Sequence, residues 1–232
     1  MTTVSEAIAQ VRARIDRAAE EAGRGEVQLL LAVKTVPAQR ILAALRTGST
    51  LIGHNRAQEM REVEPALAEV PHESHFIGHL QSNKVNQVMR WADCVQSVDS
   101  AKLARRLERA ADSRERDLEV FIQVNTSAEE SKAGIAPDEV SELAALVGEC
   151  EHLHLRGFMT IGANTQDQER VRASYAALAR IRDEVVASGI AGTASATELS
   201  MGMSGDLETA IAAGATMVRV GSGVFGARPP VE

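Results

Sequence analysis

The sequence contains few aromatic and few cysteine residues, and both shortages limit the catalytic mechanisms and binding sites that the protein can have. It has one tyrosine, one tryptophan and four phenylalanines, so a mechanism that needs a tyrosine base has Tyr175 as its single candidate. The two cysteines, Cys94 and Cys150, occur in unrelated contexts without CxxC spacing. We therefore expect buried free thiols rather than a disulfide or a zinc site.

The sequence also lacks a surplus of positive charge and any long apolar run. Its 25 Lys and Arg residues face 32 Asp and Glu, a formal net charge of −7, which gives no basic stripe for binding a nucleic-acid backbone. No apolar run approaches the roughly 18 residues of a membrane span, and the first residues form a charged amphipathic pattern rather than a signal peptide. We expect a cytoplasmic protein that binds neither nucleic acid nor membrane.

Several catalytic motifs are absent as well. The sequence contains no GxSxG, Walker A or GxGxxG motif, so hydrolase, nucleotide kinase and Rossmann dehydrogenase functions lack support. His75 and His79 are the histidine pair with the most suggestive spacing. Four residues of strand span about 13 Å, which is too far for two ligands of one ion, so no metal site is expected.

What the sequence does contain is an alternation of strand-length apolar runs with longer segments of helical spacing. The apolar runs are 27–34, one near Leu51, those from His75, Cys94, Glu119 and Leu153, one near Leu199 and one from Thr216. The helical patterns begin near Pro37, Arg56, Ser82, Ser100, Pro137, Gln166 and Ser204. With the N-terminal helix as an extra element, this pattern predicts one α/β domain over residues 1–232, a single (β/α)8 TIM barrel; an open doubly wound sheet is the alternative.

Polar residues at the carboxyl ends of the apolar runs favour the barrel. They are Lys34, Asn55, His79, Asn125, Thr160, Ser200 and Ser222. In a barrel these ends converge on one mouth, where TIM barrels carry their functional sites.

Lys34 closes the unusually apolar run LLLAV. Burial there would disfavour the ammonium form and lower the pKa of the side chain towards that of a usable amine nucleophile. Such an amine can form a Schiff base with an aldehyde. A lysine that simply extends its charged end to solvent is the alternative, and the residue alone leaves both open.

Two glycine-bearing turns follow the last two expected strands. In ELSMGMSGD, Gly202 and Gly205 separate a strand from a helix, and in VRVGSGVFG, Gly221 allows close backbone approach while Ser222 offers a hydroxyl. Backbone N–H groups and helix dipoles at such turns favour an anion, and this is the usual phosphate position of a TIM barrel. Glycines that only make turns are the alternative.

Arg219 lies between Val218 and Val220 in the last apolar run. Strict alternation points it either into the barrel or towards the helices. An arginine inside the barrel needs a partner because an unpaired buried charge is costly. A ligand acceptor or a carboxylate would serve.

Seven ordered segments resemble the pyridoxal phosphate homeostasis proteins, a family whose fold is similar to the barrel domain of alanine racemase. They are LLAVKTVP (30–37), IGHNRAQE (52–59), HFIGHLQSNK (75–84), VNTSAEESKAG (124–134), GFMTIG (157–162), LSMGMSGD (199–206) and VRVGSGVFGARP (218–229). The resemblance covers nearly the whole chain.

The resemblance implies a role for each candidate residue. Lys34 would hold pyridoxal 5′-phosphate covalently as a Schiff base; Ser200, Gly221 and Ser222 would bind its phosphate; Arg219 would approach its pyridine nitrogen; and Asn55 would line the pocket.

Two positions depart from the family pattern. His54 stands where the family usually has Glu, with a possible change in pocket electrostatics, and Val33 stands where a small hydroxyl residue is common, which would leave the lysine drier. Lys132 is a candidate for a secondary contact during transfer, and a solvated loop lysine is its alternative.

The same resemblance implies a function in intracellular pyridoxal phosphate homeostasis, without strong catalysis. The protein would be a monomer that buffers the cofactor or delivers it to pyridoxal phosphate-dependent apo-enzymes. A racemase or related enzyme is the alternative. Racemisation needs an acid or base on each face of the bound substrate, and alanine racemase takes a tyrosine for this from a further C-terminal domain. Here the sequence ends at Glu232, and Tyr175 lies in a helical pattern expected outside the barrel. A permanently charged Arg219 at the ring nitrogen would also weaken the electron sink, although alanine racemase shares this arginine.

Overall fold

The fold is a closed barrel of parallel strands, seen in the computed structural model, which describes residues 2–127, 129, 133–163 and 165–226. Each strand pairs with the next along the chain, and β8 pairs with β1, with Leu30 beside Arg219. The strands are β1 (Gln28–Ala32), β2 (Leu51–His54), β3 (Glu73–Phe76), β4 (Cys94–Val98), β5 (Leu118–Gln123), β6 (Leu153–Met159), β7 (Glu198–Ser200) and β8 (Met217–Val220). The predicted (β/α)8 barrel is therefore confirmed, and the pairing of β1 with β8 excludes the open sheet.

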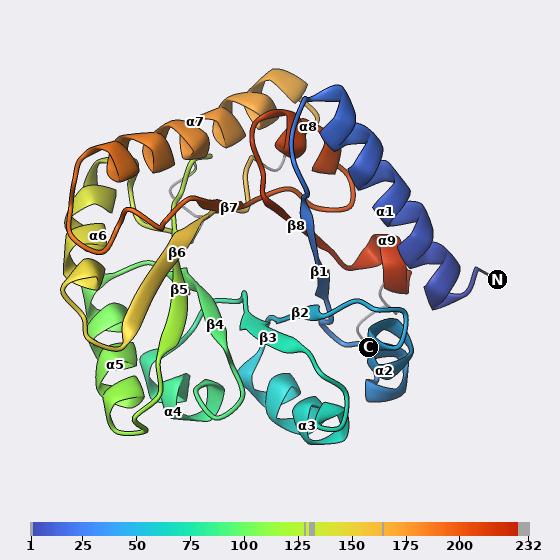
Figure 1. Cartoon of the computed structure of the whole chain (residues 1–232), viewed down its shortest axis with the longest axis horizontal. Coiled ribbons are helices and arrows are strands. Elements are labelled where there is room, and N and C mark those ends of the chain that lie inside the picture. Colours follow the sequence, from blue (N-terminus) through green and yellow to red (C-terminus); the bar gives the residue numbers. More distant parts are fainter. Residues whose placement is uncertain (1, 128, 130–132, 164, 227–232) are drawn as a thin grey trace.

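Helices surround the barrel on its outside (Figure 1). They are α1 (Val4–Glu21), α2 (Ala38–Leu45), α3 (Ala57–Leu67), α4 (Val85–Val88), α5 (Ala101–Asp112), α6 (Val140–Gly148), α7 (Gln168–Ala187), α8 (Leu207–Ala212) and α9 (Ser222–Phe225), with short 3-10 helices η1 (Ser82–Lys84) and η2 (Pro137–Glu139). The helix expected near Ser82 is short, a 3-10 turn followed by the four residues of α4.

The N-terminal helix α1 completes the ring of helices. A capping box starts it, because the Glu6 N–H donates to Thr3 Oγ1 at 3.2 Å while the Thr3 N–H donates to the Glu6 carboxylate at 2.8 Å. Ile8, Val11 and Ile15 recur at helical spacing and are buried. Helix α1 lies beside α8 and α9 (Figure 1). Since α9 spans only four residues, α1 covers the side of the barrel where a long eighth helix would otherwise pack.

The interior of the barrel contains an apolar layer and a polar one. The apolar side chains form a cluster separate from the main core, made of Leu30, Leu51, Ile77, Cys94, Phe121, Met159 and Met217. The polar side chains are His75, Gln96, Ser200 and Arg219, all buried. Buried polar groups require hydrogen-bond partners, and these four find them largely in one another.

The third strand begins earlier and ends sooner than the sequence predicted. After Phe76 the chain leaves the sheet, and Gly78 packs so closely on the loop that follows β2 that a Cβ there would overlap the carbonyl oxygen of Asn55. His79 consequently lies on a loop with 65% of its side chain exposed. The placement of His79 at the end of a barrel strand was wrong.

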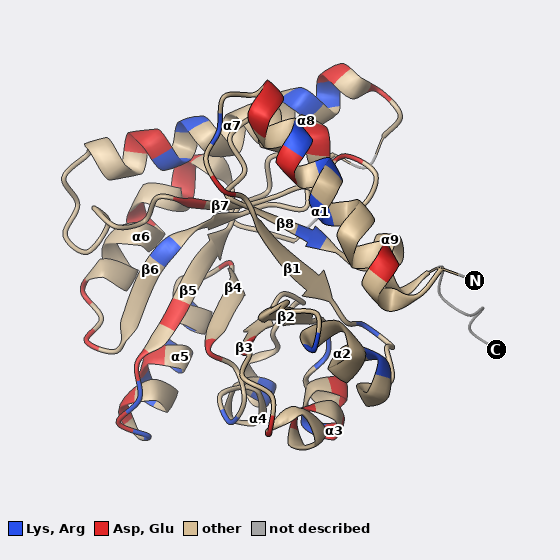
Figure 2. Cartoon of the chain, turned by 45° about the vertical axis from the view of Figure 1, so that its right-hand side comes forward, with Lys and Arg blue, Asp and Glu red and all other residues tan. Residues whose placement is uncertain are grey.

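The outer surface carries both signs of charge on the surrounding helices (Figure 2). Cys94 is buried, Cys150 is half-buried, and both are free. Among the residues that the structure describes, no helix combines the length and the apolar character needed to cross a bilayer. The same residues contain no group of three or more His, Cys, Asp or Glu side chains arranged to hold a metal ion.

Candidate functional site

A cavity of about 400 Å³ opens at the carboxyl ends of the barrel strands. Six of the residues singled out in the sequence line it: Lys34, Asn55, Gly205, Arg219, Gly221 and Ser222. They lie at or after the ends of β1, β2, β7 and β8, which the closed barrel brings to one mouth. The structure thus joins the amine, the glycine-bearing turn and the buried cation in a single space.

Lys34 stands on a tight turn directly after β1. The Val36 N–H donates to the Val33 carbonyl at 3.0 Å, which closes the turn around the lysine. Thr35 has a φ of +61°, a conformation that is strained for a β-branched residue, and its N–H donates to the Glu59 carboxylate at 3.2 Å. Lys34 itself is half-buried, and its ammonium has no hydrogen-bond partner among the described residues. Its amine is available to a ligand in the cavity.

Two serines and neighbouring backbone N–H groups form a polar corner of the cavity. Ser222 Oγ donates to Ser204 Oγ at 3.2 Å, and the Gly223 N–H donates to the same oxygen at 3.2 Å. The N–H groups of Ser204, Gly205 and Ser222 donate to no acceptor in the described part of the chain. A cluster of free N–H and O–H donors suits the oxygens of a phosphate.

Glycine is required at the β8 end of this corner. A Cβ on Gly221 would stand 2.9 Å from a carbonyl oxygen of β1, so a larger residue would force the β1 and β8 loops apart. The absence of a side chain keeps the backbone of this turn next to the lysine turn. The expected approach of the Gly221 backbone to a phosphate stays a prediction.

A buried tyrosine supports the turn that carries Ser204. The Tyr175 hydroxyl donates to the Asp206 carboxylate at 2.8 Å, and the other carboxylate oxygen accepts the Met203 N–H at 2.6 Å. Burial, together with the nearby Asp206 charge, raises the pKa of Tyr175. Helix α7 does lie outside the barrel as predicted, but the Tyr175 side chain is fully buried beneath this turn. Its role in holding the turn was not visible in the sequence.

Arg219 projects from β8 into the barrel and forms part of the cavity floor. Its guanidinium donates to the Ser200 carbonyl at 2.6 Å, to Ser200 Oγ at 2.8 Å and to the Thr160 carbonyl at 2.7 Å. All three acceptors are neutral, and no carboxylate of the described residues forms an ion pair with it. Burial lowers the pKa of Arg219 to about 10, against the opposing charges of Tyr175 and Asp206. A buried cation without a carboxylate partner favours an acceptor supplied by a ligand.

Apolar side chains form the remaining wall of the cavity. They are Ala32, Val36, Ile77, Met159, Ile161, Met203 and Phe225. Ile161 and Met203, each 41% exposed, are the large apolar side chains that the described residues leave exposed. An apolar wall beside a few convergent polar groups is typical of a cofactor site.

Comparison with known proteins shows the family to which the chain belongs. Residues 7–229 match the model of the alanine racemase N-terminal domain. A protein of Vibrio alginolyticus named pyridoxal phosphate homeostasis protein is 40% identical over 234 residues, covering 98% of this chain and 99% of that protein. The chain belongs to the pyridoxal phosphate homeostasis proteins, within the alanine racemase N-terminal domain family.

Solved structures extend the comparison with this family. PipY of Synechococcus elongatus, in a structure with PLP bound, is 31% identical, with a TM-score of 0.85 over 97% of this chain and 100% of that chain. Alanine racemase of Clostridium difficile is 14% identical, with a TM-score of 0.73 over 93% of this chain and 56% of that chain. The second likeness shows the shared barrel fold alone.

Ser200 occupies a different place from the other candidate residues. It is fully buried, does not line the cavity, and donates its hydroxyl hydrogen to Gln96 Oε1 at 2.6 Å while accepting from Arg219. Ser204, four residues later, presents a hydroxyl to the cavity instead. In the sequence, Ser204 was marked only as the start of a helix, although its place between Gly202 and Gly205 was a usable signal.

The two departures from the homeostasis-protein pattern lie behind the cavity wall. His54 Nε2 forms a 2.7 Å hydrogen bond with the Glu64 carboxylate of α3, and both residues are buried. Val33 is also buried, beside a lysine that is only half-buried. Neither His54 nor Val33 lines the cavity. Lys132 lies outside the described residues.

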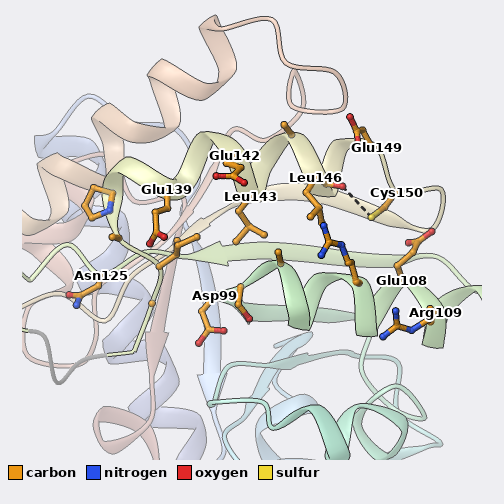
Figure 3. A pocket seen from close by; sticks show the side chains of 18 residues that line it. Asp99, Glu108, Arg109, Asn125, Glu139, Glu142, Leu143, Leu146, Glu149 and Cys150 are labelled. Carbon is orange, nitrogen blue, oxygen red and sulfur yellow. Dashed lines mark hydrogen bonds between the residues drawn. The ribbon is translucent and has the colours of Figure 1, made fainter.

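A larger cavity of about 1210 Å³ lies between α5 and α6 (Figure 3). Its charged lining consists of Asp99, Glu108, Glu139, Glu142 and Glu149 beside Arg105 and Arg109. This excess of negative charge disfavours an anionic ligand. Asn125, predicted at the barrel mouth, lines this groove and not the smaller cavity.

Proposed function

We propose that this chain binds pyridoxal 5′-phosphate in the cavity at the barrel mouth and acts in intracellular pyridoxal phosphate homeostasis, as a holder and donor of the cofactor. One observation carries the proposal: a free lysine amine, a corner of phosphate-type donors and a buried arginine without a carboxylate partner share one cavity of about 400 Å³. The names of the relatives and the PLP-bound PipY structure support it.

The donor set fits the groups that this cofactor presents. Pyridoxal 5′-phosphate supplies an aldehyde that condenses with a primary amine and releases water, and Lys34 is the one primary amine that lines the cavity among the described residues. Ser204, Gly205 and Ser222 hold the phosphate through hydroxyl and backbone N–H groups. Gly221 leaves room for it.

Arg219 would contact the pyridine ring of the cofactor. A guanidinium can only donate hydrogen bonds, so Arg219 favours an unprotonated acceptor nitrogen above the cavity floor. An unprotonated ring withdraws electrons less strongly, which suits storage of the cofactor better than carbanion chemistry. Asn55 contributes its amide to the wall, and Ser200 acts from behind by holding Arg219.

The described lining favours a holder over a racemase. Apart from arginine, Lys34 is the only titratable side chain among the described residues that line the cavity. The sole tyrosine is buried and bonded to Asp206. A second proton-transferring group on the opposite face of a substrate is therefore lacking in this part of the chain, and such a group contributes roughly 10²–10⁴-fold to a rate.

Delivery completes the proposed function. The protein, a cytoplasmic monomer, passes the cofactor to pyridoxal phosphate-dependent apo-enzymes. Ile161 and Met203 line the cavity and are exposed, so a recipient could contact them while it takes up the cofactor.

Borohydride reduction followed by peptide mapping tests the site. Protein incubated with pyridoxal 5′-phosphate and reduced should carry the pyridoxyl group on Lys34, and Lys34→Ala should carry none. Lys84→Ala, a change outside the cavity, is the matched control and should be modified like wild type. An adduct confined to Lys84 or another surface lysine would contradict the proposal.

A further inference from the structure

A continuous chain of hydrogen bonds runs through the barrel interior behind Arg219. Arg219 donates to Ser200 Oγ at 2.8 Å, and Ser200 Oγ donates to Gln96 Oε1 at 2.6 Å. Gln96 Nε2 lies 2.6 Å from His75 Nδ1, and His75 Nε2 lies 2.6 Å from the Glu73 carboxylate. The chain thus connects the cavity floor, through β7, β4 and β3, with the amino-terminal end of the barrel.

The far end of this chain is fixed by ionic contacts. The Glu73 carboxylate accepts from Arg156 at 2.8 Å, and Arg156 also donates to Glu119 and Glu198, each at 2.6 Å. The hydrogen bond from His75 outweighs burial and lowers the pKa of Glu73 to about 2. Glu73 is therefore an ionised acceptor that holds the His75 ring in place.

With the Gln96 amide oxygen towards Ser200, the donor and acceptor roles along the chain run in one direction. Arg219 has no acceptor atom, so the Ser200 hydroxyl accepts from it, and the same hydroxyl donates its own hydrogen to Gln96 Oε1. Gln96 then presents its amide nitrogen to His75, whose Nδ1 must accept. His75 consequently carries its hydrogen on Nε2 and donates it to Glu73.

Burial makes this direction costly to reverse. Ser200, Gln96 and His75 are each 0% exposed, and Gln96 Nε2 has only the Met217 sulfur, at 3.2 Å, as a further contact. Turning the amide of Gln96 would set its oxygen against the Nδ1 lone pair of His75, unless the buried ring carried a hydrogen on both nitrogens. An unsatisfied buried polar group costs more than a hydrogen bond contributes.

We infer that Gln96 and His75 are positioning residues for the cofactor ring: through Ser200 they hold the Arg219 guanidinium in the orientation that faces the cavity. Neither residue lines the cavity, so both act at a distance from the ligand. This inference rests on the proposed function, since the ring is what Arg219 would contact.

The first test uses the protein without cofactor. Nitrogen-15 NMR of the histidine side chains, with His75 assigned from the signal lost in His75→Gln, should show the Nε2–H tautomer with Nδ1 as acceptor. In Gln96→Leu, which removes the amide and leaves an apolar side chain, the Nδ1 signal should move because its donor is gone. An Nδ1–H tautomer in wild type would overturn the inference.

The second test follows the ring nitrogen itself. With pyridoxal 5′-phosphate labelled by nitrogen-15 in the ring, Gln96→Leu should shift the ring-nitrogen resonance away from its wild-type position and raise the Kd about 3- to 10-fold. Leu51→Val, which removes a methylene from the barrel interior without touching the chain, is the control for loss of packing. It should leave the resonance in place.

The two proposals fail in different ways. A wild type that forms no Lys34 adduct and binds no cofactor would contradict the proposed function, and the positioning role with it. A wild type that forms the adduct, but whose Gln96→Leu variant keeps both its Kd and its ring-nitrogen resonance, would contradict the positioning role alone.

Discussion

Removing the hydroxyls of the polar corner should weaken binding of the phosphate selectively. Ser222→Ala removes a donor from a site built for a charged group, and one hydrogen bond to a charged group is worth about 1.5–3 kcal/mol. We therefore expect the Kd for pyridoxal 5′-phosphate to rise roughly 10- to 150-fold. Pyridoxal, which lacks the phosphate, should bind to wild type and variant almost equally.

The contact between the two serines sets the result for the double variant. Ser204 Oγ accepts from both Ser222 Oγ and the Gly223 N–H, so removing either serine already disturbs the other. Because bonded neighbours are not independent, Ser204→Ala combined with Ser222→Ala should weaken binding by less than the product of the single effects.

Absorbance titration of both ligands against all variants measures these effects. Ser5→Ala, an exposed change in the first turn of α1, is the matched control and should bind both ligands like wild type. Equal losses of pyridoxal and pyridoxal 5′-phosphate in Ser222→Ala would refute the reasoning, since general damage to the cavity weakens both ligands while loss of phosphate contacts weakens only one.

Three further predictions concern catalysis, acid stability and thiol reactivity. Purified protein should not racemise alanine at an enzymatic rate, as measured by chiral chromatography; turnover of several per second would contradict the holder function. Burial would raise the pKa of Glu64, but hydrogen bonds led by those from His54 and His72 lower it to about 2, so its stabilisation is complete above about pH 4.5 and is lost as the pH falls towards 2. Glu64→Gln should accordingly lower the free energy of unfolding by about 3 kcal/mol near neutral pH in urea titrations, with the difference from wild type narrowing below about pH 4.5. Burial raises the pKa of Cys94 well above its ordinary value and that of Cys150 to about 11, so a thiol reagent near pH 8 should modify Cys150 slowly and Cys94 only in denaturant; rapid modification of Cys94 in the native protein would count against its burial.

The sequence predicted those residues of the cavity that lie directly after a strand. Lys34, Gly221 and Ser222 come just after strands, and a closed parallel barrel places all such positions at one mouth. His79 does not lie at a strand end, because β3 ends at Phe76. No local sequence pattern indicates that β3 ends there. Strand ends are therefore the weakest part of such a prediction.

The residues behind the cavity were hidden for a physical reason. Strands of a parallel barrel are buried on both faces, so their sequences read as nearly continuous apolar runs. The sequence alone does not tell whether Gln96 and His75 face the interior or the helices. The contact of Tyr175 with Asp206 likewise joins residues 31 positions apart, and helical spacing gives no sign of such a partner.

The pairing of β8 with β1, which closes the barrel, has a consequence for the order of folding. Lys34 follows the first strand and Gly221 follows the last, and these two strands become neighbours only when β8 pairs with β1. A chain still emerging from the ribosome therefore has its lysine long before it has the phosphate turn, and such a chain cannot form the complete site. Since a ligand stabilises only the state that binds it, the cofactor would act on the finished barrel alone, and its capture would report that the last strand is in place.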